Sequence, residues 1–296
     1  MYEGVKTMKK TLAFLLGVLL MMMLVACNQK AEPVGTNDDN SNNESNQVGE
    51  TNEVISELTL GEVLEKATSA SESLKSFGMK MDLEQQMSGA ETMNIKSVID
   101  MKASQEPLAI YQNITMEVQG TSEIIESEMY LTEDGIYMYE QTGEGWMKFP
   151  TEMSEVLTQS TPQQSNPAEE LKKLQEYVDD FTFEQDGSFY ILKLSASGKK
   201  FNKLINETLQ QSLPEMTEAI TASQDMKINK IEYEIWIDKK TYYPSKLAMN
   251  MDMNITDAGQ TVSLKQTMKG EYTEHNNIGE ITIPQEILDS AIEMEL

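Results

Sequence analysis

Apolar and polar residues alternate with a period of two along most of the chain. In the stretch 79–84, each of the apolar residues Met79, Met81 and Leu83 is followed by a charged residue. Such alternation predicts β-strands with one buried and one exposed face. Short turn sequences such as Asp134-Gly135 separate the alternating segments, which favours an antiparallel meander. Strands are predicted at 77–87, 93–101, 108–118, 122–132, 136–139, 146–149, 181–183, 189–192, 228–237, 247–255 and 262–268.

A helix is predicted just before the first of these strands. Over 59–76, apolar residues recur at the spacing of one helical face. Thr59 and Glu62 have the spacing of a capping box at the first turn, and Gly78 fits a residue that ends a helix. The apolar face is narrow, so we expect this helix to pack on a sheet.

Three further helices are predicted from the same period. Asn166 and Pro167 suit the N-cap and the first position of a helix over 167–178. A second apolar face recurs over 198–213, and a short C-terminal helix is expected at 285–292. The strands and helices together predict an α+β domain dominated by antiparallel sheet.

The N-terminal segment has the pattern of a secretory signal. Two lysines precede an apolar run over 12–26, which is too short to span a bilayer comfortably as a permanent helix. Leu24, Ala26 and Cys27 resemble the lipobox of bacterial lipoproteins. That resemblance implies cleavage before Cys27, a diacylglyceryl thioether on its sulfur and often acylation, such as with palmitate, of its new amine. An ordinary signal or a short membrane anchor is the alternative.

These observations divide the chain into three parts. Residues 1–26 are predicted to be a lipoprotein signal peptide, and Met8 is an alternative start to Met1. Residues 27–55 are rich in Asn, Ser, Asp and Glu, so we expect a disordered polar linker that begins at the lipidated cysteine. Residues 56–296 are expected to form a single domain. The predicted location is the extracytoplasmic face of the cell membrane.

Charge narrows the range of partners. The chain has a formal net charge of −26, and removal of 1–26, which carries +2, gives −28. Nucleic-acid binding is not expected, because phosphate binding requires clustered cations. The domain should also not adhere to an anionic membrane by its own surface, so the lipid anchor alone would hold it there.

Few residues offer catalytic or metal chemistry. Cys27 is the single cysteine, His275 the single histidine, and arginine is absent. His275 is interpreted as a surface residue at a strand end rather than a catalytic base or ligand. The pairs Glu126/Glu128 and 179–180 are interpreted as solvated charge rather than catalytic carboxylates. We therefore expect no enzyme activity, cofactor or metal site; no calcium loop is present, and only weak, diffuse divalent binding is expected.

Methionine is abundant on the apolar faces of the predicted strands. The chain has 22 methionines, of which 17 follow the signal segment. Methionine has flexible bonds and a polarizable sulfur, so it fills irregular spaces and suits binding surfaces that accept several shapes. The pattern fits either a ligand cavity or an ordinary core filled by methionine. The cavity candidates are Met79, Met81, Met93, Ile95, Ile110, Ile114, Met249, Met251, Met253 and Met268.

Two sequence stretches carry a family resemblance. Trp146 lies in a Gly-x-Gly-Trp-x-Lys stretch, and 235–244 reads as a strand, an Asp-Lys turn and a strand that starts with proline. With the lipobox, linker and order of elements, they resemble the LolA/LppX-like lipoproteins over 59–275. The resemblance implies a curved, unclosed β-barrel with helices packed on its concave face and a hydrophobic cavity for acyl chains. A Gram-positive origin is expected.

The sequence supports two functions of different classes. The first is a monomeric, membrane-anchored binding protein for a lipid or another hydrophobic small molecule. The second is an envelope interaction or sensor protein that meets another envelope protein and has no ligand cavity. The distinguishing property is whether the apolar side of the sheet is hollow or filled, which alternation alone cannot decide.

Overall fold

The computed structural model describes residues 32–33, 58–89, 92–121, 124–141, 145–150, 167–175, 180–196, 224–257 and 260–294. The predictions on the signal segment, on Cys27, on most of the linker and on the helix over 198–213 lie outside these residues.

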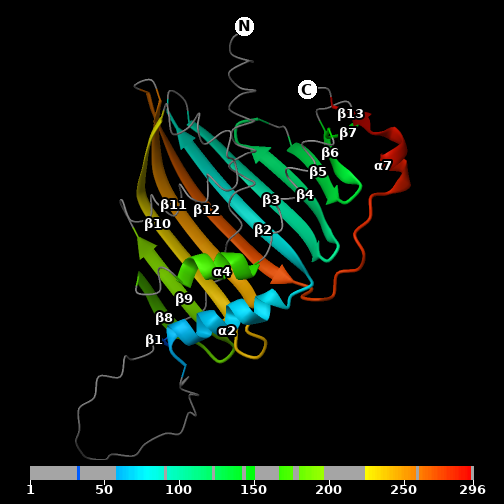
Figure 1. Cartoon of the computed structure of the whole chain (residues 1–296). Helices are drawn as coiled ribbons and strands as arrows, with labels where there is room; N and C mark the ends of the chain where they lie inside the picture. Colours follow the sequence, from blue (N-terminus) through cyan, green and yellow to red (C-terminus); the bar gives the residue numbers. More distant parts are fainter. Residues whose placement is uncertain are drawn as a thin grey trace, which may run out of the picture.

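The described strands form one sheet of thirteen strands, in the order β1-β8-β9-β10-β11-β12-β2-β3-β4-β5-β6-β7-β13. The sheet is curved, and its two edge strands do not meet (Figure 1). β13 pairs with β7 in parallel, and the other neighbours are antiparallel. The strands are β1 (Glu32–Pro33), β2 (Ser76–Ser88), β3 (Thr92–Gln105), β4 (Leu108–Val118), β5 (Ile124–Thr132), β6 (Gly135–Glu140), β7 (Gly145–Lys148), β8 (Phe181–Gln185), β9 (Phe189–Ala196), β10 (Gln224–Asp238), β11 (Pro244–Asp257), β12 (Gln260–Thr273) and β13 (Ile292–Glu293).

Two helices lie side by side against one face of this sheet, near one end (Figure 1). They are α2 (Leu60–Glu72) and α4 (Pro167–Gln175). Lys172 Nζ of α4 lies 2.9 Å from Glu72 Oε1 of α2, and the Gln175 amide donates to Thr68 Oγ1 at 3.2 Å. Leu64 and Leu171 join the core cluster of the sheet. Within the described ranges, no helix is both long and apolar enough to cross a membrane.

The start of α2 follows the sequence prediction, and its end does not. Glu62 N donates to Thr59 Oγ1 at 3.3 Å, and Thr59 N donates to Glu62 Oε2 at 2.7 Å, which completes the predicted capping box. The helix ends at Glu72 rather than Ser76, with Ser73 as its C-cap. The prediction that Gly78 ends the helix is wrong, because Gly78 is the third residue of β2. A Cβ there would lie 2.6 Å from Thr273 Oγ1, so the glycine serves the close approach of β12.

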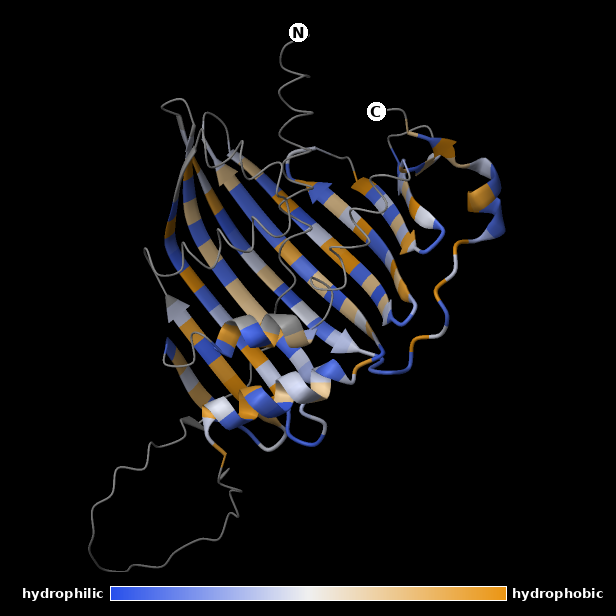
Figure 2. Cartoon of the chain, viewed as in Figure 1, coloured by the Kyte–Doolittle hydropathy of each residue, from blue (hydrophilic) through white to orange (hydrophobic). Residues whose placement is uncertain are grey.

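The sheet has two unlike faces, as the alternating colours of its central strands show (Figure 2). We call the side that carries Met79, Met81 and Leu83 the apolar face, and the side that carries Lys80 and Asp82 the charged face. Directly paired residues of neighbouring strands share a face, so the register extends both faces across the sheet. This division confirms the predicted alternation along the central strands.

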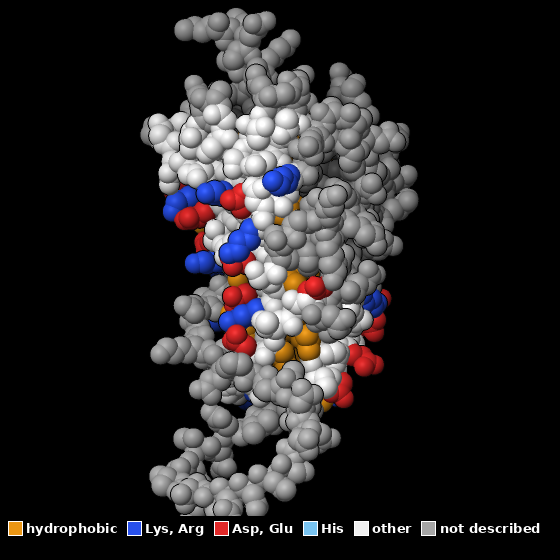
Figure 3. Space-filling model, turned by 90° about the vertical axis from the view of Figure 1, so that its left-hand side faces the viewer, with side chains coloured by type: hydrophobic (Ala, Val, Ile, Leu, Met, Phe, Trp, Pro, Cys, Tyr) orange, Lys and Arg blue, Asp and Glu red, His pale blue; other side chains and the backbone are white. Residues whose placement is uncertain are grey.

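Ion pairs join neighbouring strands on the charged face. Lys96 Nζ lies 2.6 Å from Glu84 Oε1, and Lys80 Nζ lies 3.3 Å from Asp100 Oδ2. Lysine and acidic side chains are likewise interspersed on the side of the molecule shown in Figure 3. Exposed pairs of this kind contribute little stability each, so their main effect is to keep this face in solvent.

The C-terminal segment packs against the charged face at the far end of the sheet. Ile283 and Ile287 of the segment that includes α7 (Gln285–Ser290) form a second buried cluster with Tyr137, and Tyr130 and Trp146 lie around it. The predicted C-terminal helix is confirmed, although it ends at Ser290. The pairing of β13 with β7 was not predicted, because a two-residue strand has no period to detect.

Candidate functional site

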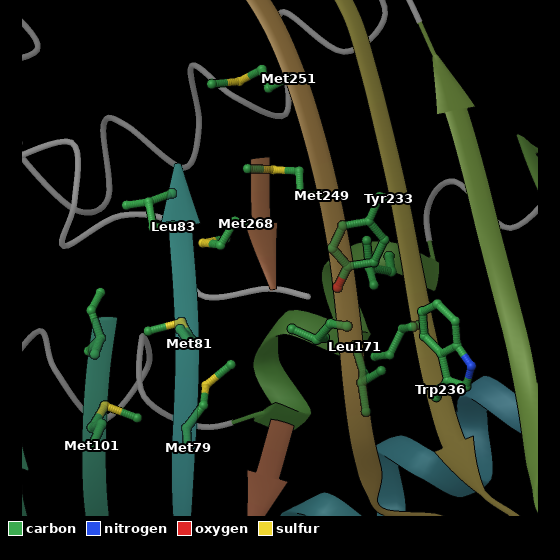
Figure 4. Packing of buried hydrophobic residues seen from close by; sticks show 14 of the residues in the cluster. Met79, Met81, Leu83, Met101, Leu171, Tyr233, Trp236, Met249, Met251 and Met268 are labelled. Carbon is green, nitrogen blue, oxygen red and sulfur yellow. The ribbon is translucent and has the colours of Figure 1, made fainter. Parts of the chain in front are cut away.

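The register of the central strands places the methionines of the apolar face side by side. Met249 of β11 lies opposite Met268 of β12, which lies opposite Leu83 of β2. In a neighbouring row, Met79 of β2 lies opposite Met101 of β3. Their side chains project to the same side of the sheet (Figure 4). These methionines and Leu83 therefore belong to one shared surface across several strands.

The ten predicted cavity residues all lie on this surface. Nine of them are buried, with no side chain more than 7% exposed, and Met93 is partly buried. Leu171 of α4 projects toward the same region from the helix side (Figure 4). The nine buried residues are Met79, Met81, Ile95, Ile110, Ile114, Met249, Met251, Met253 and Met268.

Sequence reasoning did not place three further methionines on the apolar face. Met129, Met138 and Met147 lie opposite one another on β5, β6 and β7, and each is partly buried. The signal was ambiguous there, because the alternate positions carry aromatic residues such as Tyr130 and Trp146. Only the register shows which set shares the face of Met79.

Neutral polar side chains interrupt the apolar face near its middle. The Gln85 Nε2 group of β2 donates to Gln266 Oε1 of β12 at 3.0 Å, and both side chains are buried. Ser97 of β3 is 2% exposed and lies opposite Leu83. On β2, β3 and β12, and on β11 as far as Ile255, no residue of this face within the described ranges is charged. Such a surface can receive alkyl groups and neutral polar atoms, and it offers no acid or base.

His275 is a packing residue in the structure. Its Nε2 lies 3.0 Å from the Pro244 carbonyl oxygen, and its ring stacks on Tyr243 with 5.0 Å between centroids. Burial lowers the pKa of His275 below its ordinary value. The prediction of a plain surface histidine is therefore wrong in one respect, because β12 leads directly into the turn that carries His275 against β11 and partly buries it.

The Glu126/Glu128 pair lies on the opposite side of the sheet from the methionines of the apolar face. Glu126 and Glu128 are on the charged face of β5, where Glu128 accepts a hydrogen bond from the Tyr111 hydroxyl at 3.0 Å. Asp179 lies outside the described residues. In the part of the chain that the structure describes, no group of three or more His, Cys, Asp or Glu side chains has the arrangement to hold a metal ion.

The fold and this face define a class: an α+β protein built on a curved, open antiparallel sheet, with a methionine-rich apolar face on one side. The chain belongs to the family of unknown function DUF6612, whose family model matches residues 59–292. No curated protein matches the sequence.

Several solved structures are similar in fold. LprF from Mycobacterium bovis is 10% identical, with 76% of this chain and 95% of that chain covered and a TM-score of 0.38. A LolA superfamily protein from Nitrosomonas europaea is 10% identical, with 78% and 97% covered and a TM-score of 0.23. A DUF1329 family protein from Desulfovibrio piger is 8% identical, with 70% and 90% covered and a TM-score of 0.24. Likenesses at this level carry no information on ligand or partner.

Proposed function

We propose that this protein is a membrane-anchored, extracytoplasmic binding protein that holds a lipid or another acyl chain against the apolar face. The observation that supports the proposal most strongly is the set of methionines on adjacent strands of the apolar face, which carries no charged residue on β2, β3 and β12 or on β11 as far as Ile255. Methionine side chains adapt to ligands of several shapes, whereas a core with a single purpose is better specified by Val, Ile and Leu.

The helices complete the proposed site. α2 and α4 cover one end of the methionine surface, and we propose that this is the concave face of the sheet and that the ligand lies between sheet and helices. The two helices contact each other through Glu72 and Lys172. They also share the Gln175–Thr68 hydrogen bond, and Leu64 and Leu171 are buried in the same core cluster, so both helices form a fixed wall of the proposed site.

Lipidation of Cys27 is the proposed means of attachment. The polar linker over 27–55 would let the domain rotate and meet the membrane, where its ligand resides. The net charge of −26 disfavours any direct adhesion to anionic lipids or nucleic acid. A monomer, with no catalytic step, is sufficient for this role.

The first test measures which lipids co-purify with the protein from its own membranes. Native mass spectrometry and organic extraction should reveal a co-purified lipid, and a fluorescent fatty acid should bind to the purified protein. If the folded protein carries no lipid and binds no acyl probe, the proposal fails, and the alternative of an envelope interaction protein without a cavity gains support.

The second test addresses the role of the methionines. The triple variant Met249→Leu, Met251→Leu and Met268→Leu keeps volume and hydrophobicity, so it should cost less than about 1.5 kcal/mol of stability per site. Binding of acyl probes of different lengths should narrow to fewer lengths, because leucine adapts less than methionine. Met294→Leu, at a partly buried position after β13, is the matched control. An unchanged range of probes would identify the methionines as ordinary core residues.

A further inference from the structure

Three neutral polar side chains form a small cluster within the apolar face. Gln85 and Gln266 are joined across β2 and β12 by the 3.0 Å hydrogen bond. Ser97 lies diagonally from Gln85, because Ser97 is opposite Leu83 and Gln85 is opposite Ile95. Diagonal neighbours of this kind have Cα atoms about 7–8 Å apart. We call Gln85, Gln266 and Ser97 the polar cluster.

The surroundings of the polar cluster are apolar. Met251 lies opposite Gln266 and Ile95 opposite Gln85, whereas Met116 and Leu83 flank Ser97 on the neighbouring strands. Each of these four side chains is no more than 4% exposed. The polar cluster is therefore surrounded by apolar side chains and lies on the side of the sheet opposite the charged face.

The hydroxyl of Ser97 is the unusual member. Its Oγ is buried and has no hydrogen-bond partner in the described part of the chain. A buried polar group without a partner costs about 1–3 kcal/mol, which an alanine at the same position would avoid. Fold stability therefore does not explain a serine here. A hydrogen bond to a bound molecule does, because the ligand would supply the missing partner.

The charge of the site limits what that molecule can be. The neighbouring positions of this face on β2, β3, β11 and β12 carry no lysine in the described ranges, and the lysines of these strands, such as Lys80 and Lys96, are on the charged face. A carboxylate or phosphate buried here would have no cation to pair with, and the cost of removing it from water is large. An ester, hydroxyl or amide is uncharged, so one hydrogen bond from the protein offsets most of the cost of its burial.

We propose that the polar cluster is the anchor for an uncharged polar group within an otherwise apolar ligand, with the Ser97 hydroxyl bonded to it directly. The ligand class is thus a neutral lipid with an ester, hydroxyl or amide, as in a glyceride, rather than a free fatty acid. This inference rests on the proposed function, because it requires that the apolar face binds lipid.

The test compares two probes with the same acyl chain. Displacement of a fluorescent acyl probe from the full-length protein at neutral pH is measured with monoolein and with oleic acid. The wild-type protein should bind monoolein at least tenfold more tightly. Ser97→Ala should weaken monoolein binding about fivefold, as expected for the loss of one hydrogen bond, and leave oleic acid binding unchanged.

Ser71→Ala is the matched control. Ser71 of α2 is also fully buried, and its Oγ also has no partner among the described residues, but it lies on the helix rather than on the sheet. Removal of either hydroxyl should leave thermal stability unchanged or slightly higher. Only Ser97→Ala should change the preference between the two probes.

A double variant tests the rest of the polar cluster. Gln85→Leu with Gln266→Leu removes both partners together, so that no buried amide is left unpaired. It should reduce the monoolein preference and keep oleic acid binding.

The outcomes separate the inference from the proposed function. Equal binding of both probes by the wild-type protein, or equal effects of Ser97→Ala and Ser71→Ala, would overturn the inference and leave lipid binding intact. A marked loss of stability in Ser97→Ala would also overturn it, because the hydroxyl would then serve the fold. If neither monoolein nor oleic acid binds, the proposed function is refuted and this inference with it.

Discussion

At the scale of single residues, the charged face contains a tyrosine whose environment differs from that of the exposed ion pairs around it. Tyr111 is partly buried, its hydroxyl donates to Glu128 Oε2 at 3.0 Å, and its ring lies 4.8 Å from that of Tyr130. Burial, followed by the hydrogen bond and the negative charge of Glu128, raises the pKa of Tyr111 to about 12. Its neutral form is therefore favoured in the folded protein.

This shift predicts a loss of stability at high pH. The pKa of Tyr111 is raised above the value of 10.0 that applies to the unfolded chain, so its contribution is fully present below pH 10.0 and is lost as pH rises toward about 12. Tyr111→Phe should flatten the decline in the free energy of unfolding over this range. Glu128→Gln should lower the pKa of Tyr111 but keep it above 10.0, because burial remains. Ultraviolet titration of tyrosinate, with Tyr111→Phe as the reference, measures both. An ordinary pKa for Tyr111 in the folded protein would contradict this account.

At the scale of elements, the contact between β12 and β2 depends on a residue without a side chain. Gly270 lies on the apolar face opposite Met81 and Leu247. A Cβ at this position would lie 2.9 Å from the Lys80 carbonyl oxygen and 2.9 Å from Met81 Cγ. The first of these atoms belongs to the backbone, so the strands would have to shift.

Gly270→Ala should therefore lower the free energy of unfolding by about 1–3 kcal/mol, as overpacking does in other cores. Urea unfolding followed by circular dichroism measures the change. Gly61→Ala is the control, because no atom lies within 4 Å of a Cβ at that position in α2 and alanine favours a helix. The two variants should thus differ in sign. Equal stability of Gly270→Ala and the wild-type protein would show that β12 and β2 can separate freely.

Elements also differ in how far the sequence determines their ends. The N-terminus of α2 follows from local chemistry, because the two hydrogen bonds of the capping box link residues only three positions apart. The end of α2 depends instead on β2, whose pairing with β3 begins at Ser76 opposite Ser104. That pairing joins residues far apart in the chain, so Gly78 was misinterpreted.

At the scale of the whole molecule, attachment to the membrane is proposed to depend on one atom, the sulfur of Cys27. Cys27→Ala should abolish incorporation of labelled palmitate and leave an unprocessed precursor, because the alanine has no thiol to accept diacylglycerol. Membrane fractionation with palmitate labelling measures the effect, and Asn28→Ala, which keeps the cysteine, should be labelled like the wild-type protein. A processed, labelled Cys27→Ala protein would disprove the anchor.

The sequence by itself determined the class of most described elements and the composition of the two faces, because a strand with one face in water must alternate with a period of two. It also determined how few candidate catalytic side chains the chain has, because a single histidine and a single cysteine can be counted directly from the residues.

The tertiary structure alone decided which alternating segments share a surface. Met129, Met138 and Met147 join the apolar face through register, and Ser97 comes to lie diagonally from Gln85, which pairs with Gln266, for the same reason. Register is set by pairing between strands that are distant in sequence, and Gln85 and Gln266 are 181 positions apart. Local periodicity carries no information on such contacts, so the polar cluster became visible only when the sheet was assembled.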